Sequence, residues 1–172
     1  GHHKQVLDAL LAFAQVHEGH ARRLLAHAAY VAEFALAERA LAAELTERAA
    51  AAPGAAAQGA LLYASAGSQF SQLGQRERGA AALQRALTLG GEQTSGVLMA
   101  LGDYFFERAE TVPVAAARDP SYDQAARHYR RAIAVGQVPT PELGKVRLRL
   151  AAVERRRQNP IAEEQELAAA VE

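Results

Sequence analysis

Residues 63–91 read YASAGSQFSQLGQRERGAAALQRALTLGG, and this stretch sets the pattern for the chain. Apolar and small residues recur in it at the spacing of two short helices, with Gly74 at the turn between them. The first-helix pattern returns at Leu98, 35 residues further on (98 − 63 = 35). A unit with this period buries its apolar face only by stacking on its neighbours.

The positions that define the unit follow a known spacing. They are Tyr63, Ala66-Gly67 and Phe70 at the spacing W-x2-L-G-x2-Y, then Gly79, Leu83 and Ala86 at the spacing A-x3-F-x2-A. The segment therefore resembles a tetratricopeptide repeat, although most of its residues are smaller than those usual in the family.

Further copies of the pattern follow downstream. The second copy comprises Leu98, Leu101-Gly102 and Phe105, then Ala125, Tyr129 and Ala132 on the second helix. A fainter third copy comprises Leu150-Ala151, Leu167 and Ala170. In that copy Glu154 and Glu163 occupy places where an aromatic and a small residue are usual.

The resemblance covers roughly residues 60–172 and implies an all-α fold, a right-handed superhelix of about eight helices. We expect one domain over residues 4–172, preceded by a tag remnant at residues 1–3. Its parts are N-terminal helices (4–54), a clear repeat (60–93), a repeat with an inserted loop (94–139) and a degenerate repeat or cap (140–172).

Composition narrows the class of protein. The chain is 50% hydrophobic but only 6% aromatic, its formal net charge is zero and it lacks cysteine. The zero net charge disfavours nucleic acid binding, and the lack of cysteine excludes thiolate chemistry and disulfides. No apolar stretch is long enough to span a membrane. Alanine and arginine dominate, and Lys4 and Lys145 are the only lysines, which indicates a bacterial source.

Residues 20–52 contain neither glycine nor proline and carry apolar residues at helical spacing. The pattern predicts one long helix of about 33 residues, roughly 50 Å at 1.5 Å per residue. Such a helix either protrudes or splits into two near residues 29–37. A protruding helix would suit a homodimer.

The second repeat carries an insertion of about 11 residues between its helices, relative to the first. Pro113 and Pro120 forbid a continuous helix there. The insertion is either a tolerated surface excursion or a contact loop, in which Val112, Val114 and Arg118 would touch a partner.

No pattern for catalysis or metal binding occurs in the sequence. His17, His20 and His27 lie close together but lack carboxylate partners at a metal-binding spacing. There is neither a G-x-S-x-G nucleophile elbow nor a phosphate-binding loop. We expect no enzymatic activity, no metal and no cofactor.

In the family that the chain resembles, the first helix of each repeat lines a concave groove for a peptide or a partner helix. The resemblance places Met99, Asp103, Phe106, Glu107, Lys145, Arg149 and Arg156 in this groove. It also places Leu61, Ala64, Ser68, Ser71, Gln72, Leu148 and Ala152 there. Phe106 and Met99 are the expected anchors, unless Phe106 packs against the inserted loop instead.

The arginines near the C-terminus admit two interpretations. Neighbouring glutamates can neutralise them in an internal ion-pair surface, or they can face an acidic protein partner. One subgroup of the family binds a partner's C-terminal carboxylate with Lys and Asn side chains. In this chain Ala64, Ser68 and Ala100 occupy the positions of those donors, so we do not expect binding of that kind.

The expected function is a non-catalytic scaffold or adaptor that holds another protein or peptide, and the family resemblance suggests an envelope, secretion or polysaccharide-export assembly. The alternatives are a self-associating module that uses residues 20–52 and a regulatory domain that senses a small ligand. Either bacterial cytoplasm or periplasm fits the sequence, and a membrane tether outside it is compatible with both.

Overall fold

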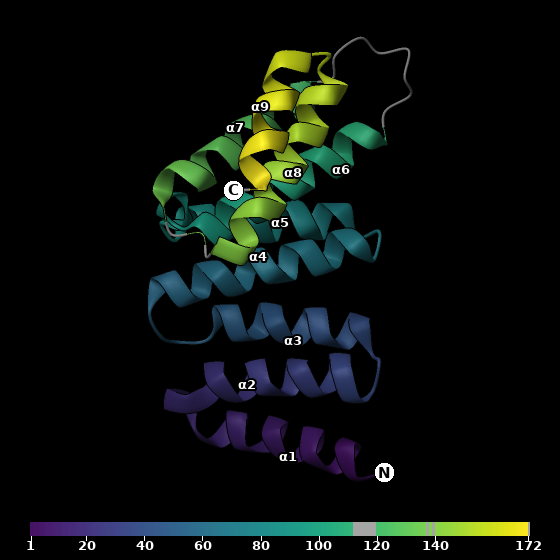
Figure 1. The fold of residues 1–172 in the computed structure, drawn as a ribbon. Coiled ribbons are helices and arrows are strands. Elements are labelled where there is room, and N and C mark those ends of the chain that lie inside the picture. Colours follow the sequence, from purple (N-terminus) through teal and green to yellow (C-terminus); the bar gives the residue numbers. More distant parts are fainter. Residues whose placement is uncertain (112–119, 137, 139, 172) are drawn as a thin grey trace. The chain divides into compact units, whose positions relative to one another are not determined.

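The computed structural model describes residues 1–111, 120–136, 138 and 140–171. Every regular element in this part of the chain is helical, so the prediction of an all-α fold is confirmed (Figure 1). The predicted contact residues Val112, Val114 and Arg118 lie outside the described residues.

Contacts group the chain into two compact units, Gly1–Gly91 and Glu92–Glu172. The first contains α1 (His2–Val16), α2 (Ala21–Tyr30), α3 (Arg39–Ala51), α4 (Ala56–Gln72) and α5 (Arg76–Thr88). The second contains α6 (Ser95–Glu110), α7 (Pro120–Val135), α8 (Thr140–Arg156) and α9 (Pro160–Ala170). That these helices form one continuous superhelix and one domain stays a prediction.

The expected continuous helix over residues 20–52 is wrong. A π-helical turn, Val31–Ala35, follows α2, and the chain then reverses through Leu36, Ala37 and Glu38. Ala37 takes a positive φ of 57°, and the Glu38 amide donates to the Ala32 carbonyl. The alternative, a split near residues 29–37, is confirmed, because α2 and α3 pack against each other as a hairpin.

The first unit is a stack of neighbouring helices with an alanine-rich core (Figure 1). Helices α1, α2 and α3 share one buried cluster, which includes Leu7, Leu25, Ala28, Ala32 and Leu45. Alanine side chains fill little space, so the helix backbones approach closely and few large residues are needed.

The crossing of α4 and α5 shows why the repeat pattern needs small residues. A Cβ on Gly67 would lie 2.8 Å from Cγ of Leu83 and 3.0 Å from the backbone oxygen of Gly79. Tyr63 and Phe70, one turn to either side of Gly67, are buried, as the pattern predicts. The repeat spacing therefore encodes this close crossing.

In the second unit α6 packs on α7, α7 on α8 and α8 on α9. Tyr129 of α7 is buried against α6, together with Val146 and Leu150 of α8. Leu150 and Ala151 are both buried, as expected for the small-residue pair of the third copy.

The unusual residue of that third copy, Glu154, is 0% exposed. Its carboxylate accepts hydrogen bonds from Arg130 (2.7 Å), Arg157 (2.8 and 2.9 Å) and Asn159 (3.2 Å). A charged network thus stands where an aromatic side chain is usual. Asn159 also caps α9 by accepting from the Ala162 amide.

Candidate protein-binding faces

Exposed or half-exposed residues form one stripe on each of four helices, at positions i, i+4, i+7 and i+11, which share a helix face. We call the first two stripes the α2–α4 face; its residues are Arg23, His27 and Tyr30 on α2, Phe34 on the π-helical turn that follows α2, and Leu61, Ser65, Ser68 and Gln72 on α4. We call the other two the α6–α8 face; its residues are Met99, Asp103, Phe106 and Glu110 on α6 and Lys145, Arg149, Ala152 and Arg156 on α8.

Polar contacts at two places link the α2 segment to the α4 segment, and they show that α2 and α4 run in the same direction. At the start of α2, the Arg22 guanidinium donates to the carbonyls of Ala52 (2.6 Å) and Ala55 (2.5 Å), which precede α4. Beyond the end of α2, Glu33 accepts from Gln69 in the second half of α4 (3.2 Å). Arg22 is therefore a structural residue, since it also satisfies carbonyls freed at the end of α3.

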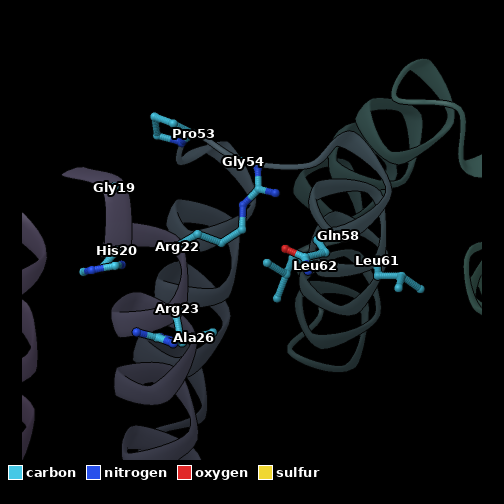
Figure 2. A pocket seen from close by; sticks show the side chains of 10 residues that line it. All are labelled: Gly19, His20, Arg22, Arg23, Ala26, Pro53, Gly54, Gln58, Leu61 and Leu62. Carbon is cyan, nitrogen blue, oxygen red and sulfur yellow. The ribbon is translucent and has the colours of Figure 1, made fainter. Parts of the chain in front are cut away.

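A pocket of about 550 Å³ opens between these helices, close to the start of the α2–α4 face. Its lining includes apolar Ala26, Pro53, Leu61 and Leu62 and polar His20, Arg22, Arg23 and Gln58. Figure 2 shows Arg22 reaching from α2 toward Gly54, with Gln58 and Leu62 of α4 across the pocket. Pockets of this volume with an apolar wall and few polar groups commonly bind ligands or side chains.

Farther along the α2–α4 face lies an exposed aromatic pair. The rings of Tyr30 and Phe34 pack against each other with centroids 4.7 Å apart, yet the two residues are 64% and 69% exposed. Leu61, on the α4 stripe, is 45% exposed. Exposed large apolar side chains such as the Tyr30 and Phe34 pair are typical of an interaction site.

The charges of the α2–α4 face are separated along it. Arg22 and Arg23 lie at the pocket end, whereas Glu33 lies near the aromatic pair. Among the residues that the structure describes, no carboxylate lies within 4.0 Å of the Arg23 guanidinium. The exposed Arg23 side chain can therefore meet an acidic group from outside without breaking an internal ion pair.

The α6–α8 face is built differently, because its charges pair with each other. Arg149 of α8 donates to both carboxylate oxygens of Asp103 on α6, at 2.6 and 2.8 Å. Two turns further along both helices, Arg156 pairs with Glu110 at 2.9 and 3.0 Å. These pairs link α6 to α8 and show that the two helices run parallel. Both arginines are therefore in internal ion pairs, but with acids of α6 and not with the glutamates near them in the sequence, as the interpretation of an internal ion-pair surface had expected.

Asp103 is the most heavily engaged residue of this face. It also accepts a short hydrogen bond from the Tyr129 hydroxyl. Burial raises the pKa of Asp103, against the opposing effects of the Tyr129 hydrogen bond and the Arg149 charge. Burial also raises the pKa of Tyr129, and the Asp103 carboxylate raises it further. The network joins α6, α7 and α8, so Asp103 has a structural role.

The expected anchors of this face are half-buried. Phe106 packs near Tyr122 of α7, with ring centroids 6.1 Å apart, and Met99 packs against the same cluster. Glu107 is exposed, and Lys145 pairs with Glu142 on its own helix at 2.8 Å. In the first repeat the expectation for Ala64 is wrong, because this residue is buried rather than groove-facing.

Sequence reasoning missed the α2 stripe altogether. The signal was present, since Leu25, Ala28-Ala29 and Ala32 have the same spacing as Tyr63, Ala66-Gly67 and Phe70. All four residues are buried, as in the later copies. Alanine at nearly every position hid the pattern, and so did the expectation of one long helix there.

Among the described residues, none of the helices is both long and apolar enough to cross a bilayer. A metal site requires a group of three or more His, Asp or Glu side chains close together, and the described residues contain no such group.

Comparison with known proteins gives a likeness to a solved structure. No family model matches the chain, and no curated protein matches it. The crystal structure of BtubC (BKLC) from P. vanneervenii superposes with a TM-score of 0.69 at 21% sequence identity, over 87% of this chain and 61% of that chain. The chain therefore spans less than two thirds of the length of BtubC. At this identity the likeness shows the fold alone, and the chain shares its all-α fold with BtubC.

Proposed function

We propose that the chain is a tetratricopeptide-like repeat protein with at least three helical hairpins. The support is local and repeated. Each of α2, α4 and α6 buries a small residue at the same place in the repeat spacing, and these residues are Ala29, Gly67 and Gly102. Each of these helices packs on the helix that follows it.

We further propose that the protein is a non-catalytic adaptor that holds a segment of another protein on the α2–α4 face. The observation that carries this proposal is the exposed pair Tyr30 and Phe34, which lies on one stripe with the pocket-lining Arg23. Burial of each aromatic ring by a partner would contribute about 1.5–3 kcal/mol. The half-buried Met99 and Phe106 leave less apolar area to gain on the α6–α8 face.

A peptide selection tests this function. A random peptide library displayed on phage is panned on the wild-type protein and counter-selected on a Tyr30→Ala/Phe34→Ala variant. We expect enriched peptides that bind the wild type at least tenfold more tightly than the double variant. Phe13→Ala is the matched control, because Phe13 is 57% exposed on α1, away from this face.

Phe106→Ala reports on the α6–α8 face in the same assay. If the enriched peptides bind the Phe106→Ala variant more weakly but bind the double variant as tightly as the wild type, the binding site lies in the second unit. A library without any enriched peptide would refute the adaptor function.

Self-association is the second candidate, because the same exposed aromatic pair can be covered by another copy of the chain. Its original basis, a protruding helix, is wrong. Leu24 and Leu41 belong to the apolar stripe of that expected helix. Both pack against the buried cluster of α1, α2 and α3, so substituting them would not test self-association. Light scattering across a concentration series, on wild type and Phe34→Glu, tests it instead. A dimer that Phe34→Glu abolishes would favour self-association over the adaptor function.

A further inference from the structure

We propose that the α2–α4 face selects an extended acidic segment, with a side-chain carboxylate at the pocket end and a bulky apolar residue on Tyr30 and Phe34. This inference rests on the adaptor function proposed above and specifies its partner. It concerns carboxylates within a segment, not a chain terminus.

The pocket end supplies the preference for a carboxylate. Arg23 is exposed there without an internal ion pair among the described residues, and His20 lies beside it in the lining. The first turn of α2 carries no acidic residue, and no side chain caps its amides. Arg22 holds the wall in place through its bonds to backbone carbonyls.

The acidic residues near the face determine at which end a carboxylate can bind. Glu33 lies beside Phe34 and accepts from Gln69, so a carboxylate at the aromatic end would meet a like charge. Glu18 lies in the 3₁₀ turn before α2 and is exposed. The α4 stripe is uncharged. The only place on the face where an incoming carboxylate meets an arginine is thus the pocket end.

The helix fixes the spacing between the two contacts. Tyr30 follows Arg23 by about two turns of α2, roughly 10 Å at 1.5 Å per residue, and Phe34 lies about one turn further on, in the π-helical segment Val31–Ala35. An extended chain covers that distance in about three to five residues at 3.3 Å each. A matching segment therefore has its acidic and apolar residues three to five positions apart.

Synthetic peptides test both chemistry and spacing. Each is a fluorescein-labelled Gly/Ser 12-mer with amidated C-terminus, which carries one Glu-Glu pair and one Leu-Phe pair. The spacing between the pairs is one, four or eight residues, and Gln-Gln and Lys-Lys versions are matched controls. By fluorescence anisotropy in 50 mM salt, we expect the Glu peptide with a spacing of four to bind best. Replacement of Glu by Gln should weaken it about three- to tenfold, as for charge-assisted contacts at an exposed site.

Charge reversal on the protein identifies the responsible residue. Arg23→Glu should make the Lys peptide bind better than the Glu peptide, and Arg23→Gln should remove the difference. Arg48→Glu is the control, because Arg48 is exposed on α3 and lies outside the α2–α4 face. Circular dichroism confirms that each variant is folded.

The outcomes separate this inference from the adaptor function. Equal binding of the Glu and Gln peptides, an Arg23→Glu variant that keeps the acidic preference, or no binding with a Kd below about 1 mM would overturn the inference. Phage-selected peptides that depend on Phe34 but contain no acidic residues would also overturn it, while leaving the adaptor function intact.

Discussion

At Gly102 the absence of a side chain lets the ring of Tyr129 lie directly on the backbone of α6. A Cβ built on Gly102 would stand 2.5 Å from Cε1 and 2.6 Å from Cδ1 of that ring. The ring is rigid and almost fully buried, and its hydroxyl is bonded to Asp103, so it has no easy way to move.

We therefore predict that Gly102→Ala destabilises the protein by about 1–3 kcal/mol, as overpacking does in a closely packed core. The shift in the midpoint of urea unfolding measures it. Gly19→Ala is the control, because nothing lies within 4 Å of a Cβ there. If the two variants unfold at the same urea concentration, the ring of Tyr129 does not lie on α6 as described.

At the scale of elements, α8 keeps the repeat pattern although one of its buried positions is charged. Glu154 holds Arg130 of α7, Arg157 at the end of α8 and Asn159 at the start of α9. One carboxylate thereby links three helices. Removal of one partner from a buried charge network leaves the others desolvated without compensation.

We predict that Glu154→Gln destabilises the chain by about 2–4 kcal/mol, because Arg157 would lose its buried counter-ion. Arg157 is left with Asp123, whose side chain is 59% exposed. Thermal unfolding followed by circular dichroism measures the effect, and Glu164→Gln, exposed on α9, is the control. Equal melting temperatures for the two variants would show that the network contributes little.

The helices show how far sequence patterns reach. The spacing of apolar residues and Gly74 at the turn predicted the helix pair that the structure shows as α4 and α5. The turn after α2 was not predictable in this way. It uses a π-helical segment and a positive φ at Ala37, in a stretch of good helix formers. Packing of α2 on α3 decides that turn, and packing is not visible in local propensity.

The candidate faces follow the same rule. Alignment to the repeat placed Asp103, Phe106, Arg149 and Arg156 on exposed or half-exposed stripes, because helical periodicity fixes the face. It did not predict that the arginines pair with acids on a neighbouring helix, which depends on the distance between α6 and α8. Nor did it find Tyr30 and Phe34, because their helix was taken as part of a longer one.

For the whole molecule, the division into two compact units has a consequence for folding and binding. The α2–α4 face, its pocket and the buried cluster of α1, α2 and α3 all lie within residues 1–91. In stacks of helical hairpins, stability comes mainly from contacts between nearest neighbours. A fragment that ends at Gly91 keeps every such contact of its own unit.

We predict that fragment 1–91 folds on its own and retains the binding properties of the α2–α4 face. Circular dichroism should show a helical fragment with a cooperative thermal transition. The phage-selected peptides whose binding depends on Phe34 should bind the fragment within about threefold of their affinity for the full chain. Fragment 92–172, which carries the paired charges of the α6–α8 face, is the control and should not bind them. An unfolded fragment 1–91 would mean that its nearest-neighbour contacts are not sufficient. A folded fragment without affinity would mean that binding requires residues of the second unit, and the site would then have to be sought beyond the α2–α4 face.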